Sequence, residues 1–163
     1  MAREERQELS RRCAPVMVLR FLPLLLLALS ACGSYPRDPD GTLDRVRASH
    51  VFRVGLIPTA PGADARAPAF LAAVTNATGA RPVTVTGGAE PLLLELEAGK
   101  LDLVIGELAD DSPWVDRVSI LDPLAERTTP SGRVTLHPIA KNGENAWIML
   151  LERQRRLVGG PKR

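Results

Sequence analysis

Cysteine and histidine are almost absent from this chain of 163 residues. There are two cysteines, Cys13 and Cys32, and two histidines, His50 and His137. Neither histidine stands near a serine, a cysteine or a carboxylate at a spacing used for metal binding or nucleophilic catalysis. A framework of several disulfides and a metal site built from several cysteines are therefore excluded. We expect no enzymatic activity and no cofactor, and we interpret both histidines as structural or surface residues.

An excess of charge is also lacking. The formal net charge is +2, from 21 basic and 19 acidic residues. Five of the arginines and three of the glutamates precede Cys32, which leaves 16 residues of each sign from Cys32 onward. Such a balance indicates neither a nucleic-acid-binding surface nor a polybasic membrane-binding face. We therefore expect no nucleic acid among the partners.

No apolar run is long enough to make a good membrane span. The run from Phe21 to Ala31 has about 11 residues, whereas a membrane-spanning helix needs about 20. It follows an arginine-rich segment that ends in Arg20, which is the layout of a signal peptide. The end of this run and the following cysteine, Leu29-Ser30-Ala31-Cys32, resemble a lipobox, the motif at which bacterial lipoproteins are cleaved and acylated. We predict a signal peptide over residues 1–31, a lipid on Cys32, and a location on the periplasmic side of a bacterial membrane.

Two starts of the chain remain open. Residues 1–16 include three glutamates and are longer than a charged leader needs, so Met17 is an alternative start and 1–16 an over-long gene prediction. In either case Cys13 is not part of the mature chain, because it precedes the predicted cleavage site before Cys32. Gly33 stands where an aspartate is associated with inner-membrane retention, so delivery to the outer membrane is a hypothesis.

The mature chain divides into a tether, one domain and a tail. Residues 32–42 are rich in Gly, Pro and Asp without apolar periodicity, which is typical of a tether. Residues 43–158 alternate short apolar runs with amphipathic segments, and 159–163 form a flexible tail. The apolar runs predict strands at 51–57, 82–86 and 101–106. Helices are predicted between them, over about 68–78 with Gly79 as its C-terminal cap, and after Gly87-Gly88 with Pro91 in its first turn and Gly99 just past its end.

Strand, helix, strand, helix, strand within roughly 55 residues favours an α/β domain, with a mainly parallel sheet and helices on both faces. Further strands are predicted at 117–120 and 133–140, and a last helix at 144–157. On that helix Trp147, Leu150 and Leu151 should face inward. We interpret Trp147 as a core residue in preference to a ligand-stacking residue.

Three segments resemble the bacterial extracellular solute-binding proteins of family 3. They are GTLDRVRASHVFRVGL at 41–56, LLLELEAGKLDLVIGEL at 92–108 and ILDP at 120–123. The resemblance implies a type II periplasmic-binding-protein-like fold of two hinged lobes that hand a solute to an ABC permease. Here about ten residues, Leu124 to Arg133, separate ILDP from the returning strand, so the second lobe is expected to be missing.

Ligands of open α/β sheets bind beyond the carboxyl ends of the parallel strands. That edge should contain the candidate ligand-binding residues Thr59, Thr86, Gly87, Glu107 and Asp111. Trp114 is a further candidate, at the position where the resemblance implies a ligand-binding residue. The alternative is that these residues form turns and helix caps and have no part in ligand binding. The resemblance implies an arginine that grips a carboxylate, but Trp114 stands at its place and Asp111 is acidic. We therefore do not expect this chain to have the amino-acid specificity that the resemblance would imply.

Two functions follow as hypotheses. One is an envelope lipoprotein that captures a small solute weakly for a transporter, because one lobe supplies only one wall of a clamp. The alternative is a protein-interaction module that docks on a transporter subunit or another envelope protein through an apolar patch where the second lobe would pack. A gene product without a biochemical role is a third possibility.

Overall fold

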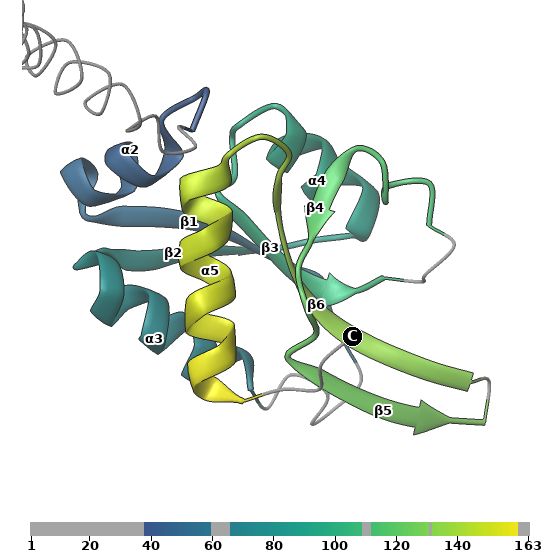
Figure 1. Cartoon of the computed structure of the whole chain (residues 1–163). Helices are drawn as coiled ribbons and strands as arrows, with labels where there is room; N and C mark the ends of the chain where they lie inside the picture. Colours follow the sequence, from purple (N-terminus) through teal and green to yellow (C-terminus); the bar gives the residue numbers. More distant parts are fainter. Residues whose placement is uncertain (1–37, 60–65, 109–111, 131, 160–163) are drawn as a thin grey trace, which may run out of the picture. The chain divides into compact units, whose positions relative to one another are not determined.

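A computed structural model describes residues 38–59, 66–108, 112–130 and 132–159 (Figure 1). The predicted signal peptide, Cys32, Asp111 and the tail from residue 160 lie outside the described residues. Every described element belongs to one compact unit that begins at Pro36. None of the described helices is long and apolar enough to cross a membrane.

All the elements predicted from the sequence are present, together with a first helix and a strand that were not predicted. In chain order they are α2 (Thr42–Ser49), β1 (Val51–Leu56), α3 (Ala67–Thr78), β2 (Arg81–Thr86), α4 (Ala89–Glu97), β3 (Leu103–Glu107), β4 (Val118–Ile120), β5 (Ala125–Thr129), β6 (Gly132–Lys141) and α5 (Asn145–Val158).

The sheet has the strand order β2-β1-β3-β6-β4, and β5 pairs with β6. β1 lies between β2 and β3 and is parallel to both, as the alternation of strands and helices predicts. β6 is antiparallel to β3, β4 and β5. The predicted α/β class is therefore confirmed, and an antiparallel part completes the parallel part of the sheet.

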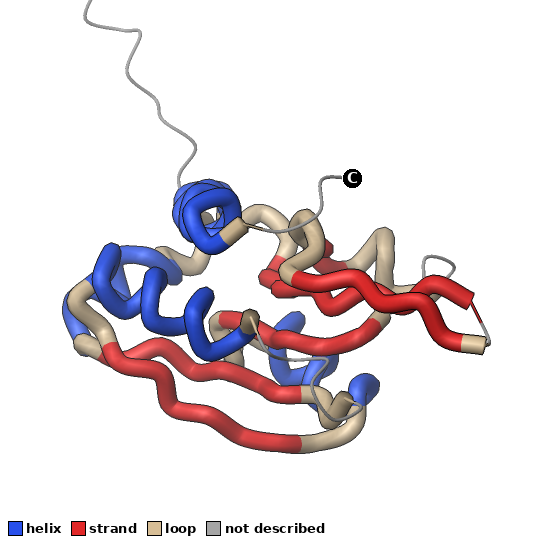
Figure 2. Tube along the Cα trace, turned by 90° about the horizontal axis from the view of Figure 1, so that it is seen from below, coloured by secondary structure: helices blue, strands red, loops and turns tan. Residues whose placement is uncertain are grey.

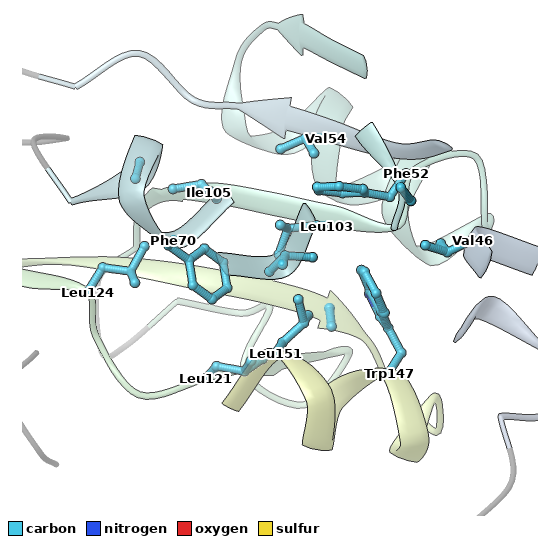
Figure 3. Packing of buried hydrophobic residues seen from close by; sticks show 14 of the residues in the cluster. Val46, Phe52, Val54, Phe70, Leu103, Ile105, Leu121, Leu124, Trp147 and Leu151 are labelled. Atoms are coloured by element: carbon cyan, nitrogen blue, oxygen red, sulfur yellow. The ribbon is translucent and has the colours of Figure 1, made fainter. Parts of the chain in front are cut away.

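Helices cover both faces of the sheet. On one face α2, α3 and α5 pack on alternate residues of β1 and β3, including Phe52 and Leu103 (Figure 3). Trp147 of α5 lies edge-on to Phe52, with ring centroids 6.1 Å apart. On the other face α4 packs its leucines on Val104. Because β3 is buried on both faces, its sequence is an almost continuous apolar run.

Local sequence fixes the ends of α3. A proline lies in its first turn, where the missing N–H costs no helical hydrogen bond. Gly79 adopts the left-handed conformation, with φ of 71°, and donates its N–H to Thr75 O at 2.8 Å. This is the C-terminal cap that the sequence predicted.

Residues at the end of the predicted tether bind the folded unit. The Asp38 carboxylate accepts hydrogen bonds from Leu43 N–H in α2 and from Ala146 and Trp147 N–H in α5, at 2.9, 2.6 and 3.1 Å. In return the buried Glu144 carboxylate accepts the N–H groups of Asp40 and Thr42. Both acids occupy helix N-termini, where unpaired N–H groups and the helix dipole favour negative charge.

A hairpin stands where the resemblance implies a second lobe. β5 and β6 pair from Ala125 opposite Leu136 to Thr129 opposite Gly132, and this pair extends beyond the other strands (Figures 1 and 2). The Thr129 hydroxyl donates to Gly132 O at 2.9 Å across the turn. The chain therefore returns directly along β6, as the short separation of the two segments predicted.

Candidate functional site

The carboxyl ends of the three parallel strands meet at one edge of the sheet. Leu56 of β1 is level with Thr86 of β2 and with Ile105 of β3. Gly87 N–H donates to Leu56 O at 3.2 Å, and Ile57 N–H donates to Ile105 O at 2.9 Å. This edge therefore brings together three of the predicted residues, Thr86, Gly87 and Glu107, and Thr59 follows β1 there.

A glycine at the end of β3 allows the ends of β1 and β3 to pack closely at this edge. Ile57 packs directly on Gly106, so that a Cβ atom at this position would lie 2.7 Å from Ile57 Cβ. Real Cβ atoms do not tolerate that separation. The glycine of the sequence LDLVIG is therefore required for close packing between the ends of β1 and β3.

An arginine that the sequence did not point to lies at the same edge. Arg127 of β5 donates from Nε to Glu107 Oε1 at 3.0 Å and from Nη2 to Glu107 Oε2 at 2.9 Å. Both side chains are partly exposed, 35% for Arg127 and 22% for Glu107. The guanidinium offsets the charge of Glu107, so this part of the edge carries both signs of charge and not only the expected negative one.

Trp114 lies in the apolar cluster under α4. It is 9% exposed and belongs to the same cluster as Leu92 and Leu96. The guanidinium carbon of Arg117 stands 4.2 Å from the centroid of the indole, and Arg117 also forms a fork-shaped ion pair with Glu97. Trp114 therefore packs in this cluster, which also contacts Ile57 and Leu108, the residues that follow β1 and β3 at the candidate edge.

The two histidines fit the structural interpretation. His137 is buried, with Nδ1 2.8 Å from Leu121 O and Nε2 2.6 Å from Thr135 Oγ1. His50 is the C-terminal cap of α2, in the left-handed conformation. Within the described ranges no group of three or more His, Cys, Asp or Glu residues is placed to hold a metal ion.

A second cluster of charges lies at the opposite end of β3. The fully buried Asp102 carboxylate accepts hydrogen bonds from Arg53 N–H, Nε and Nη2 at 2.7, 3.0 and 2.7 Å, and pairs with Arg45 Nη1 at 2.9 Å. Its hydrogen bonds raise the pKa of Arg53 above the ordinary value, although burial of the guanidinium acts in the opposite direction. Asp102 therefore interrupts the apolar run of LDLVIG for a structural reason.

Neither a family model nor a curated protein matches the sequence. Several solved structures match the fold. The arginine-bound form of domain 1 from TmArgBP has a TM-score of 0.59 at 13% identity, covering 70% of this chain and 98% of that one. The periplasmic VFT2 domain of Bordetella pertussis BvgS has a TM-score of 0.58 at 11% identity, covering 77% and 95%. An ancestral cationic amino acid solute-binding protein has a TM-score of 0.57 at 10% identity, covering 71% and 93%.

At such identities the likeness establishes the fold alone. The match to an isolated domain 1 runs over almost all of that domain. The protein therefore has the fold of a single lobe of a periplasmic binding protein.

Proposed function

We propose that this protein is an envelope lipoprotein, anchored through Cys32, whose single lobe captures a small polar solute weakly for a transporter such as an ABC permease. The observation that carries the proposal is the polar edge at the carboxyl ends of β1, β2 and β3, on a lobe that matches the solute-binding fold. That edge is where open α/β sheets bind ligands.

The chemistry of the edge suits a small solute with both donors and acceptors. Glu107 offers carboxylate oxygens, Arg127 offers guanidinium N–H groups, and Thr86 offers a hydroxyl. The N-terminus of α4, which begins just after Gly88, adds backbone N–H groups. Capture should be weak, because a single lobe cannot bury most of a ligand's surface.

Thermal unfolding of the unit from Pro36 to Arg163 tests capture. That unit contains every described element and both apolar clusters. Amino acids, amines, sugars and oxyanions are each added at about 1 mM. A solute with Kd near 10 μM should stabilise the fold by roughly 2.7 kcal/mol.

The matched variants are Glu107→Gln, at the candidate site, and Arg133→Ala, in an exposed ion pair of the hairpin. Stabilisation should be reduced by the first variant and unchanged by the second. If no compound stabilises the protein, or if both variants respond like the unsubstituted unit, solute capture at this edge is rejected.

The anchor is tested separately in cells. A labelled fatty acid should attach to the full chain and to Cys13→Ala, but not to Cys32→Ala, because only Cys32 stands at the end of the lipobox-like sequence. Labelling that survives Cys32→Ala would contradict the anchor without affecting the solute-binding test.

The alternative, docking on a protein through an apolar patch at the missing lobe, receives less support. The large hydrophobic side chains most exposed among the described residues are Val83, Val85, Leu94, Val115, Met149 and Leu157. None of them lies on β5 or β6, the hairpin to which a second lobe would be joined. The proposal of solute capture is therefore preferred.

A further inference from the structure

The outer edge of β2 is an unused pairing surface. β2 is the first strand of the sheet and pairs with β1 on one side. No other strand of residues 38–59, 66–108, 112–130 or 132–159 pairs with it. This edge lies on the opposite side of the sheet from the β5–β6 hairpin (Figure 1).

The hydrogen bonds of β2 show which backbone groups point outward. Arg81 N–H donates to His50 O and Gly87 N–H donates to Leu56 O, so the odd-numbered residues face β1. Because the direction of backbone groups alternates along a strand, Pro82, Thr84 and Thr86 face away from β1. Proline has no N–H, so the outward donors are those of Thr84 and Thr86, while all three residues offer outward carbonyls.

Charged residues are scarce around this edge. The 23 residues from Ala67 to Ala89 contain one charged residue, Arg81, although a quarter of the whole chain is charged. On one face of β2 the side chains of Val83 and Val85 are 44% and 45% exposed. Natural edge strands are commonly protected from pairing by lysine or other charges. Here the protective features of the strand are Arg81 at its first position and Pro82, which removes one donor.

The helix beside this edge is also uncharged. α3 packs on α5 and contacts β2, and its exposed residues are small or amide-bearing: Pro68, Ala69, Ala72, Asn76 and Ala77. A second molecule can therefore approach this side of the edge without burying a charge of α3, which would be costly.

We infer that two copies of this chain pair through β2, antiparallel and around a two-fold axis at Thr84. Thr84 is then opposite Thr84 of the other copy, and each donates its N–H to the other's carbonyl. Each Thr86 N–H meets a Pro82 carbonyl, so every outward donor of the strand is used and the missing N–H of proline costs one bond per copy.

The side chains fit the same register. Val83 stands opposite Val85 of the other copy, and Val85 opposite its Val83, so four half-exposed valines form one apolar cluster on a single face. A two-fold axis is the commonest symmetry of soluble oligomers, and it requires a self-complementary surface of this kind. The dimer joins two sheets edge to edge and leaves the carboxyl ends of β1 and β3 uncovered.

Disulfide cross-linking of the full chain tests the dimer and its register. Thr84→Cys places two thiols directly opposite each other, with Cα atoms about 5.5 Å apart, a separation that a disulfide spans. Thr86→Cys, on the same edge, is the matched control, since its two copies would lie more than about 10 Å apart. The unsubstituted chain measures any cross-link through Cys13 or Cys32.

Mild oxidation should convert most of Thr84→Cys to a covalent dimer, and at least tenfold less of Thr86→Cys. Adding Val83→Lys and Val85→Lys to Thr84→Cys should abolish the dimer, because lysines then oppose lysines at positions whose exposure lets the fold tolerate them. The inference is overturned if Thr84→Cys stays monomeric, if both cysteine variants cross-link equally, if the lysines have no effect, or if Thr84→Cys cross-links to a different protein instead.

Discussion

The two ends of β3 carry the same kind of ion pair in different surroundings. At its beginning, Arg53 and Arg45 hold the fully buried carboxylate of Asp102. At its end, Arg127 forms a bidentate pair with Glu107, and both side chains remain in contact with water. The arginine–carboxylate pairing at the beginning of the strand is therefore part of the packed interior, whereas the pairing at its end is accessible to solvent.

Burial decides which of these pairs matters for folding. A carboxylate without exposure depends on its partners for all its hydrogen bonds, and removal of any part of the network is expensive. An exposed pair exchanges its hydrogen bonds with water at little cost. We therefore expect stability to depend on the Asp102 end of the sheet and ligand binding to depend on the Glu107 end.

Asp102→Ala should produce the largest effect. It removes a buried acceptor of several charge-assisted hydrogen bonds and leaves Arg53 N–H without its 2.7 Å partner. We expect a loss of about 3 kcal/mol in the free energy of unfolding, measured with urea. The isosteric Asp102→Asn should lose less, because an amide oxygen still accepts. A loss below about 1 kcal/mol for Asp102→Ala would contradict the assignment of this end to stability.

Gly106→Ala should have an intermediate effect. The added methyl group would overlap Ile57, and the ends of β1 and β3 must separate to admit it. A destabilisation of about 1 to 3 kcal/mol is expected by thermal or urea unfolding. Gly88→Ala is the control, since a Cβ atom there meets only Pro91 Cδ, at 3.6 Å. Equal effects of the two substitutions would show that contact with Ile57 is not the cause.

Arg127→Ala should have the smallest effect on stability. Glu107 retains access to water after the guanidinium is removed, so the change in the free energy of unfolding should stay within about 1 kcal/mol. Binding of any solute found by thermal unfolding should nevertheless change, since the edge then carries an unopposed negative charge. A loss of stability comparable to that of Asp102→Ala would remove the distinction between the two ends.

The sequence predicts the strands and helices that have strong local signals. Alternation of apolar segments predicts the three parallel strands, and Gly79 marks the end of α3, because these features depend on neighbouring residues. β5 was missed since its sequence, AERTT, is mostly polar and its partner is β6 alone. The antiparallel direction of β6 depends on that same hairpin.

Features built by distant residues were beyond sequence reasoning. α2 has two buried residues, and the N–H of its first residue, Thr42, donates to the carboxylate of Glu144, about a hundred residues later in the chain. At the candidate site, Thr86, Gly87 and Glu107 were placed correctly at the edge by the parallel topology. The pairing of Glu107 with Arg127 could not be predicted, because it requires β5 to lie beside that edge.

A nuclear magnetic resonance titration of the unit from Pro36 to Arg163 shows where on the fold a solute binds. Amide signals are followed while a solute that stabilises the protein is added. Shifts should be concentrated at Thr59, Thr86, Gly87 and Glu107, with the signals of Arg53 and Asp102 unchanged. Shifts concentrated at Arg53 and Asp102, or no shifts with any solute, would contradict solute binding at the candidate edge.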